Sequence, residues 1–152
     1  MDFFENIRLG RTEDIQSSLA AEPSLVHQKN AKGFPALVLA SYNNHYDVTH
    51  ILIKNGAEVN ARDAAGNTAL MGISFKGYTA IAELLLNNDA DVNAQNSTGA
   101  TALIFAAMFD QQEFVDLLLK NGADKEITDS KGNTAHAYAV MKENRALADK
   151  LK

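Results

Sequence analysis

Apolar side chains recur along the chain in triplets with helical spacing. Val48, Ile51 and Leu52 stand at positions i, i+3 and i+4, which places them on one face of a helix. The same spacing returns at Ile81, Leu84 and Leu85, and again at Phe114, Leu117 and Leu118. Weaker copies, each with a polar middle residue, are Ile15, Ser18 and Leu19 near the start and Leu147, Lys150 and Leu151 at the end. The pattern predicts a series of short amphipathic helices.

The polar positions between these helices repeat with one period. Glycine returns every 33 residues, and the segment that begins two residues after each glycine is also repeated. The glycines are Gly33, Gly66, Gly99 and Gly132, and the segments are 35–37 (Pro-Ala-Leu), 68–70 and 101–103 (Thr-Ala-Leu), and 134–136 (Thr-Ala-His). A second block reads Asn-Gly-Ala-Glu-Val-Asn-Ala at 55–61, with close copies at 88–94 and 121–124. Agreement of several columns at one spacing indicates an internally repeated fold.

Each repeat predicts a turn, a short helix, a short loop, a second helix and a long loop. The threonine before the first helix can cap it, because its hydroxyl can accept a hydrogen bond from an unpaired N–H of the first turn. Gly56 and Gly122 follow the second helix, where a left-handed residue usually ends a helix. Asp89 takes that position in the copy between them, and Asp tolerates the left-handed conformation less well than Gly.

This unit resembles the ankyrin repeat. That family has units of this length, which open with Gly-x-Thr-Pro-Leu-His and close with Leu-Leu-x-x-Gly-Ala-Asp-Val-Asn-Ala. The closing motif matches well at residues 84–94 and 117–124. The opening departs from the pattern, because alanine replaces the proline in every copy and the histidine position is occupied by Val38, Met71, Ile104 and Ala137. The histidine network of the family is therefore missing, and apolar packing must hold the helix pair together.

The resemblance implies an all-α solenoid of stacked helix-turn-helix units with β-hairpin-like loops, about five repeats long including the caps. The whole chain, 1–152, is expected to be a single domain. Residues 1–29 are expected to form an N-terminal capping repeat and residues 129–152 a C-terminal capping repeat. The full repeats are expected at residues 30–62, 63–95 and 96–128.

The resemblance also implies where a partner binds, because family members usually use the hairpin tips and the exposed side of the first helices. The column at the end of the first helix is apolar in every copy and reads Leu9, Tyr42, Phe75, Met108 and Met141. The next column reads Gly10, Asn43, Lys76, Phe109 and Lys142. An exposed apolar stripe with polar neighbours is typical of an interaction surface. The predicted partner-binding residues are Phe34, Tyr42, Asn43, Phe75, Lys76, Met108, Phe109, Met141 and Lys142.

Three alternatives stay open at this point. The apolar column could instead pack between adjacent repeats as part of the core. Phe34, next to Pro35 at a hairpin tip, is either a contact residue or a cover over Leu37. Lysines near the groove would favour an acidic segment of a partner, although they could equally form an ordinary solvated surface. These lysines are Lys32, Lys76, Lys131 and Lys142.

Composition narrows the function classes. The chain has no cysteine, which excludes disulfides, thiolate metal sites and a cysteine nucleophile. The net charge of −5 argues against nucleic-acid binding, which needs a concentrated basic surface. The start of the chain does not resemble a secretory signal, and no apolar run approaches the roughly 20 residues that span a bilayer. A cytoplasmic protein without membrane contact is therefore expected.

The sequence also lacks the motifs of common enzymes and metal proteins. It contains neither a glycine-rich phosphate loop nor a Gly-x-Ser-x-Gly elbow. His45 and His50 are five residues apart and do not share a helical face, so they do not suit a metal. His45 falls where the family often has a histidine at the start of the second helix, which implies a structural role. No enzymatic activity, cofactor or metal is expected.

The leading functional hypothesis is a non-catalytic protein–protein interaction module that binds a partner through its concave groove. One alternative is an inhibitor or immunity-like protein that blocks an enzyme or toxin. A second alternative is a structural protein that self-associates. The chain on its own is expected to be a monomer, and its sequence does not identify the partner.

Overall fold

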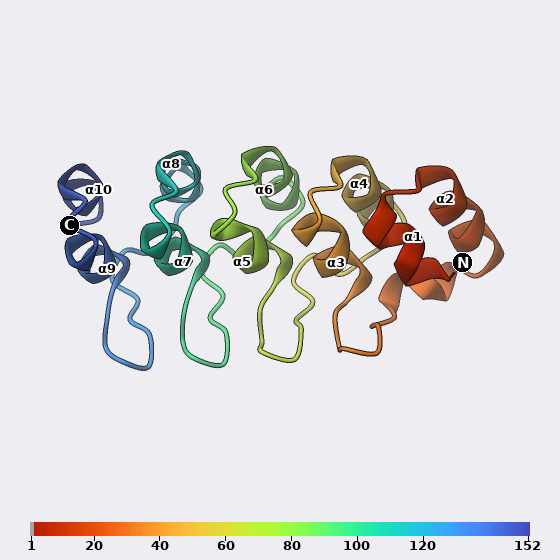
Figure 1. The fold of residues 1–152 in the computed structure, drawn as a ribbon, viewed down its shortest axis with the longest axis horizontal. Helices are drawn as coiled ribbons and strands as arrows, with labels where there is room; N and C mark the ends of the chain where they lie inside the picture. The colour runs from red at the N-terminus through yellow and green to blue at the C-terminus, as the bar shows by residue number, and fades with distance from the viewer. Residues whose placement is uncertain (1) are drawn as a thin grey trace.

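The fold, taken from a computed structural model that describes residues 2–152, is a row of helix pairs stacked in one direction (Figure 1). The first helices of the pairs are α1 (Phe3–Leu9), α3 (Ala36–Tyr42), α5 (Ala69–Ser74), α7 (Ala102–Met108) and α9 (Ala135–Met141). The second helices are α2 (Thr12–Ala21), α4 (Tyr46–Lys54), α6 (Thr79–Leu86), α8 (Gln112–Lys120) and α10 (Arg145–Lys150). A 3₁₀ helix, η1 (Pro23–His27), follows α2. The first helices form one layer and the second helices form another.

The expected all-α solenoid is confirmed. Within residues 2–152 the only β-type pairing is one isolated antiparallel bridge between Lys29 and Pro35. Each helix pair falls inside one of the five expected residue ranges, and the long loops project from one side of the stack (Figure 1). The exact repeat boundaries stay a prediction.

The helices begin and end where the local chemistry predicts. The hydroxyl oxygens of Thr68, Thr101 and Thr134 accept hydrogen bonds from N–H groups three residues later, at 3.4, 3.2 and 3.1 Å. Helix α3 is preceded by Pro35 and has no side-chain cap. These threonines satisfy donors that would otherwise be unpaired in the first turn of α5, α7 and α9.

The second helices of the three inner pairs are each followed by a left-handed residue. The φ angles are +92° at Gly56, +70° at Asp89 and +88° at Gly122. Asp89 therefore adopts a conformation in which its Cβ is crowded, as the sequence predicted.

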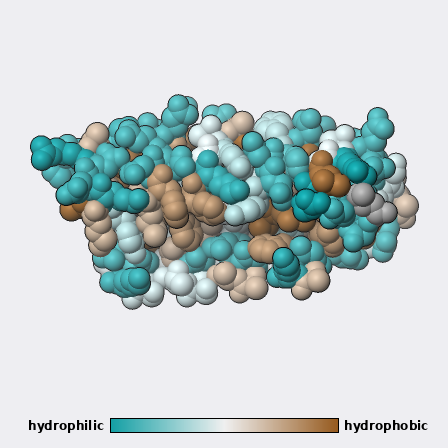
Figure 2. Space-filling view, viewed as in Figure 1, coloured by the Kyte–Doolittle hydropathy of each residue, from teal (hydrophilic) through white to brown (hydrophobic). Residues whose placement is uncertain are grey.

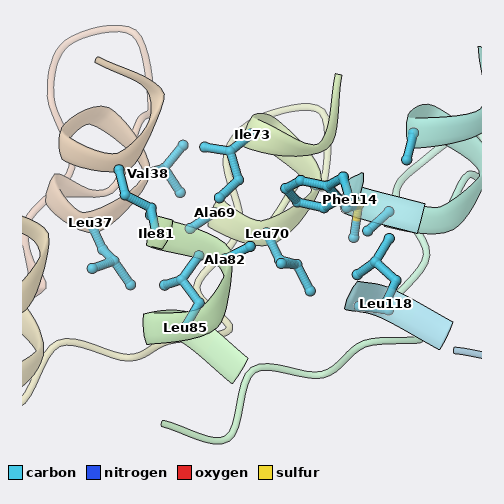
Figure 3. Packing of buried hydrophobic residues seen from close by; sticks show 14 of the residues in the cluster. Leu37, Val38, Ala69, Leu70, Ile73, Ile81, Ala82, Leu85, Phe114 and Leu118 are labelled. Atoms are coloured by element: carbon cyan, nitrogen blue, oxygen red, sulfur yellow. The ribbon is translucent and has the colours of Figure 1, made fainter. Parts of the chain in front are cut away.

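The core lies between the two helix layers and continues from one repeat to the next (Figure 3). In each inner triplet the first and third residues are buried, whereas Ile51 and Leu117 in the middle position are half-buried. The fully buried triplet residues are Val48, Leu52, Ile81, Leu85, Phe114 and Leu118. Leu37, Leu70 and Leu103 on the first helices belong to the same core cluster. A single repeat cannot bury this face alone, so stacking holds the fold together.

Polar side chains tie the loops of adjacent repeats to one another. The Asn60 amide donates to the Asp89 carbonyl at 3.2 Å and accepts from the Asp91 N–H at 2.7 Å. Asn93 makes the same two bonds one repeat later, to the Gly122 carbonyl and from the Asp124 N–H. These bonds keep successive long loops in register, so they help to set the spacing between repeats.

Candidate partner-binding groove

The predicted apolar column is exposed at its ends and half-buried in its middle. Tyr42 and Met141 end the first helices α3 and α9 and are 41% and 61% exposed. Phe75 and Met108, in the middle of the column, are half-buried. Phe109, from the next column, is 50% exposed. None of these residues is fully buried, but Met108 packs against the core, so the column combines exposed surface with packing against the core.

Apolar surface gathers in patches across the middle of the face shown in Figure 2, where the first helices lie in Figure 1. More hydrophilic surface predominates along the upper edge, over the second helices. The first helices α3, α5, α7 and α9 contain no acidic residue, and their charged neighbours lie in the short loops that follow them.

Three aromatic rings form a continuous row across three repeats. The ring centroids of Tyr42 and Phe75 are 5.9 Å apart, and those of Phe75 and Phe109 are 5.5 Å apart. These distances fall within the range of favourable aromatic pairs. Phe109 joins this row although it belongs to the neighbouring sequence column. We call Tyr42, Phe75 and Phe109 the aromatic row.

Lys76 lies against one end of the aromatic row. Its Nζ atom is 4.1 Å from the centroid of the Tyr42 ring and 5.8 Å from that of Tyr78. A cation at this distance from a ring face is attracted by the π electrons. The sequence prediction did not include Tyr78, which stands just before α6. In the sequence, only the position of Tyr78, one repeat after His45 and one repeat before Gln111, could have indicated its place.

Two members of the column that holds His45, Tyr78 and Gln111 link their repeat to the one before it. His45 Nε2 is 2.7 Å from the Arg8 carbonyl oxygen, and the Gln111 amide donates to the Phe75 carbonyl at 2.8 Å. His45 therefore has the structural role that the resemblance implied. At the equivalent position Tyr78 makes no hydrogen bond through its side chain within residues 2–152, and its ring lies near Lys76 instead.

The remaining predicted residues lie around the aromatic row or away from it. The Asn43 side chain is half-buried and donates to the Leu39 carbonyl at 2.8 Å, so it caps its own helix. Phe34 is half-buried near a hairpin tip, so one part of its ring packs against the core and another part stays accessible. Met141 and Lys142 are exposed on the last repeat.

Sequence reasoning missed Val140, which is 54% exposed. The equivalent residues Ser41, Ser74 and Ala107 are 0% exposed, because the following helix pair covers that side of α3, α5 and α7. Val140 lies on the same side of α9, in the last pair of the chain. Its exposure depends on stacking, so no local pattern could have indicated it.

Each hairpin tip is held by an acceptor side chain. The side-chain oxygens of Asn30, Asp63, Asn96 and Asp129 each accept from the N–H groups two and four residues later. Asp129 also accepts a short hydrogen bond from the Tyr138 hydroxyl. The tips are therefore preformed turns of the kind that Asn and Asp favour.

Asp129 and Tyr138 perturb one another's ionisation. Burial alone would raise the pKa of Asp129, but the hydrogen bonds from Tyr138 and from the N–H groups of Asn133 and Lys131 hold that pKa below its usual value. The same hydrogen bond raises the pKa of Tyr138 above its usual value. The bond therefore favours a charged carboxylate and a neutral hydroxyl in the folded state.

Replacing Tyr138 by phenylalanine should reduce stability only where this bond is intact. The carboxylate's contribution is present above the unfolded pKa of about 4 and is lost as the pH falls through the lower folded pKa of Asp129. The hydroxyl's contribution is present below about pH 10 and is lost as the pH rises through the raised pKa of Tyr138.

Urea unfolding of the native chain and Tyr138→Phe across the pH range measures this effect. The difference in free energy of unfolding should be largest between about pH 5 and 9 and should shrink at both ends. Tyr46→Phe is the matched control, because the Tyr46 hydroxyl makes no hydrogen bond within the described chain. A difference for Tyr138→Phe that is independent of pH would contradict the assignment.

Within residues 2–152, no three His, Asp or Glu side chains gather into a group that could hold a metal ion. No helix in this part of the chain is both long and apolar enough to cross a membrane.

The stacked helix pairs define a helical-repeat solenoid, a class in which each repeat contacts only its neighbours. A family profile described as ankyrin repeats (3 copies) matches residues 7–96 and, in a second match, residues 70–152. The two matches together cover most of the chain, so the protein belongs to the ankyrin-repeat family. Ankyrin repeats are generally protein–protein interaction modules, and the family is typically non-catalytic. No curated protein sequence matches the chain.

Proposed function

We propose that this protein is a non-catalytic module that binds one partner protein along the exposed face of its first helices. The observation that carries the proposal is the aromatic row, whose end residues Tyr42 and Phe109 are 41% and 50% exposed. Aromatic residues and Met are enriched at protein interfaces, and a few clustered aromatic side chains often supply most of the binding energy. A ring that stays in water does not gain the favourable free energy of burial, and a partner that covers the ring would supply that gain.

The aromatic row and its neighbours form the proposed site. Tyr42, Phe75 and Phe109 are the anchors, with Met108 and Lys76 beside them. A stable interface buries about 800 Å² on each partner, which is more than three rings supply. The proposed flanking contacts are Phe34, Asn43, Met141 and Lys142.

The test is affinity capture from a lysate of the source organism with matched baits. The groove variant carries Tyr42→Asp and Phe109→Asp, which place two carboxylates in the aromatic row. The control carries Tyr46→Asp, because Tyr46 is 44% exposed but lies on α4 in the other helix layer. We expect a partner that the native and control baits capture and the groove variant loses by at least about 100-fold, since each lost anchor costs about 2 kcal/mol or more.

A partner that the groove variant still captures would move the site to the hairpin tips or the other helix layer. Circular dichroism of all baits shows whether the helical content is unchanged, which separates lost binding from lost folding. The captured protein also separates the alternatives. An enzyme or toxin whose activity falls on binding would support an inhibitor, whereas recovery of this chain alone, with a dimer in sedimentation, would support self-association.

A further inference from the structure

Lys76 brings a positive charge to the aromatic row and forms no ion pair within residues 2–152. Residues 2–152 contain three ion pairs, Arg8–Glu5, Lys150–Asp116 and Lys152–Asp149, and Lys76 belongs to none of them. Its ammonium group lies over the Tyr42 ring and near the Tyr78 ring. Helices α3, α5 and α7 contain no acidic residue, and Asp110, which follows Phe109, accepts a hydrogen bond from the Asn144 amide.

A partner that covers the aromatic row will also remove water from this ammonium group. Burying a charge is costly unless the charge is paired and hydrogen-bonded. A carboxylate of the partner would supply that pair through a charge-assisted hydrogen bond. The two tyrosine rings already restrict the lysine side chain, so less conformational entropy is lost when the pair forms.

The spacing of the rings indicates the secondary structure of the partner. Successive centroids are 5.9 and 5.5 Å apart. An α-helix presents a new residue on one face about every 5.4 Å, the rise of one turn. Same-face residues of a β-strand are about 6.6–6.8 Å apart, so a strand would lose register with the rings along the row. The helical spacing fits the row better.

We propose that the aromatic row binds an amphipathic helix of another protein that carries a carboxylate facing Lys76. Apolar residues at positions i, i+3 or i+4, and i+7 of this helix lie along the aromatic row, and an Asp or Glu on its flank pairs with Lys76. This inference rests on the proposed function, because it specifies the chemistry of the partner that covers the same face of the first helices.

The probe is a displayed library of random peptides of about 20 residues, which span about 30 Å when helical. Peptides are selected on the native protein and depleted against the variant with Tyr42→Asp and Phe109→Asp. We expect the surviving peptides to share apolar residues with helical spacing and at least one Asp or Glu. Circular dichroism should show that they gain helix on binding.

Lys76 variants then test the charge. Lys76→Met keeps an unbranched side chain near Tyr42 but removes the ammonium, and it should weaken the selected peptides about tenfold in fluorescence anisotropy. Lys120→Met is the matched control, because this substitution removes the same charge from the end of α8, in the other helix layer. The Lys120→Met protein should bind the peptides as tightly as the native protein does. Lys76→Glu should weaken binding further, and a peptide with Lys in place of its acidic residue should restore it.

Three results would overturn the inference: peptides that alternate apolar residues as a strand does, peptides without an acidic residue, or peptides that Lys76→Met does not affect. A library that yields no groove-dependent peptide would overturn it as well. The lysate experiment separates this failure from failure of the proposed function. A natural partner that the Tyr42→Asp and Phe109→Asp variant loses but Lys76→Met fully retains would leave the groove assignment standing and exclude the paired carboxylate.

Discussion

Replacing Phe114 by alanine should lower the free energy of unfolding by about 3–5 kcal/mol. Phe114 is 0% exposed and leads the fully buried side chains in size. It stands on α8 and points into the core between the helix layers (Figure 3). Removing the ring deletes its buried apolar area and leaves a cavity, which the surrounding close-packed side chains can fill only in part.

Urea unfolding followed by far-UV circular dichroism measures this loss. Phe109→Ala is the matched control, because it removes the same ring from a side chain that is 50% exposed. It should cost less than about 1 kcal/mol, since water already reaches one side of the ring. Equal losses in the two variants would mean that the core of this repeat is not where the structure places it.

The second large effect is expected at the hairpin glycines. Gly99 has a φ angle of +77°, and a Cβ added there would lie 3.0 Å from the Ser130 nitrogen and 3.2 Å from the Asp129 Cα. Gly99→Ala should therefore cost about 2–4 kcal/mol. About 1–2 kcal/mol comes from the left-handed backbone and the rest from pushing the next hairpin away. The hydrogen bond from the Ser130 N–H to the Thr98 carbonyl, at 2.9 Å, lies at this contact.

Gly132→Ala separates these two contributions. Gly132 has a similar φ of +79°, but within residues 2–152 no atom beyond its own chain neighbours lies within 4 Å of an added Cβ. This variant should lose only the conformational part, about 1–2 kcal/mol. Urea unfolding of both variants should show the larger loss for Gly99→Ala. If Gly132→Ala were equally destabilised, contact between neighbouring hairpins would contribute nothing to stability.

Much of the fold could be predicted because its signals are local. The triplets beginning at Val48, Ile81 and Phe114 predicted the second helices, since helical spacing alone decides which side chains share a face. The threonine caps and the left-handed Asp89 follow from hydrogen bonding and backbone sterics within a few residues. Repetition at one period then predicted that the units stack.

The candidate site was predicted only as a set of columns. The sequence indicated that Tyr42 and Phe75 are equivalent, but not that Phe109, one column over, completes the row with them. It identified Lys76 as a charge near the groove, but not its position over Tyr42. Both facts depend on which side-chain rotamers the neighbouring repeats allow. The contacting residues are about 33 positions apart in the sequence, so a local pattern does not predict their contacts.

The sequence by itself therefore determined the helices, their caps, the repeat period and the family, because each of these is set by interactions within one repeat or by similarity between repeats. Only the tertiary structure decided how far each side chain of the apolar column is exposed, that Val140 is uncovered, and that Lys76 lies over Tyr42. The physical reason is stacking. Whether an apolar side chain is buried, and which group a polar one meets, depends on the surface that the adjacent repeat presents or leaves open.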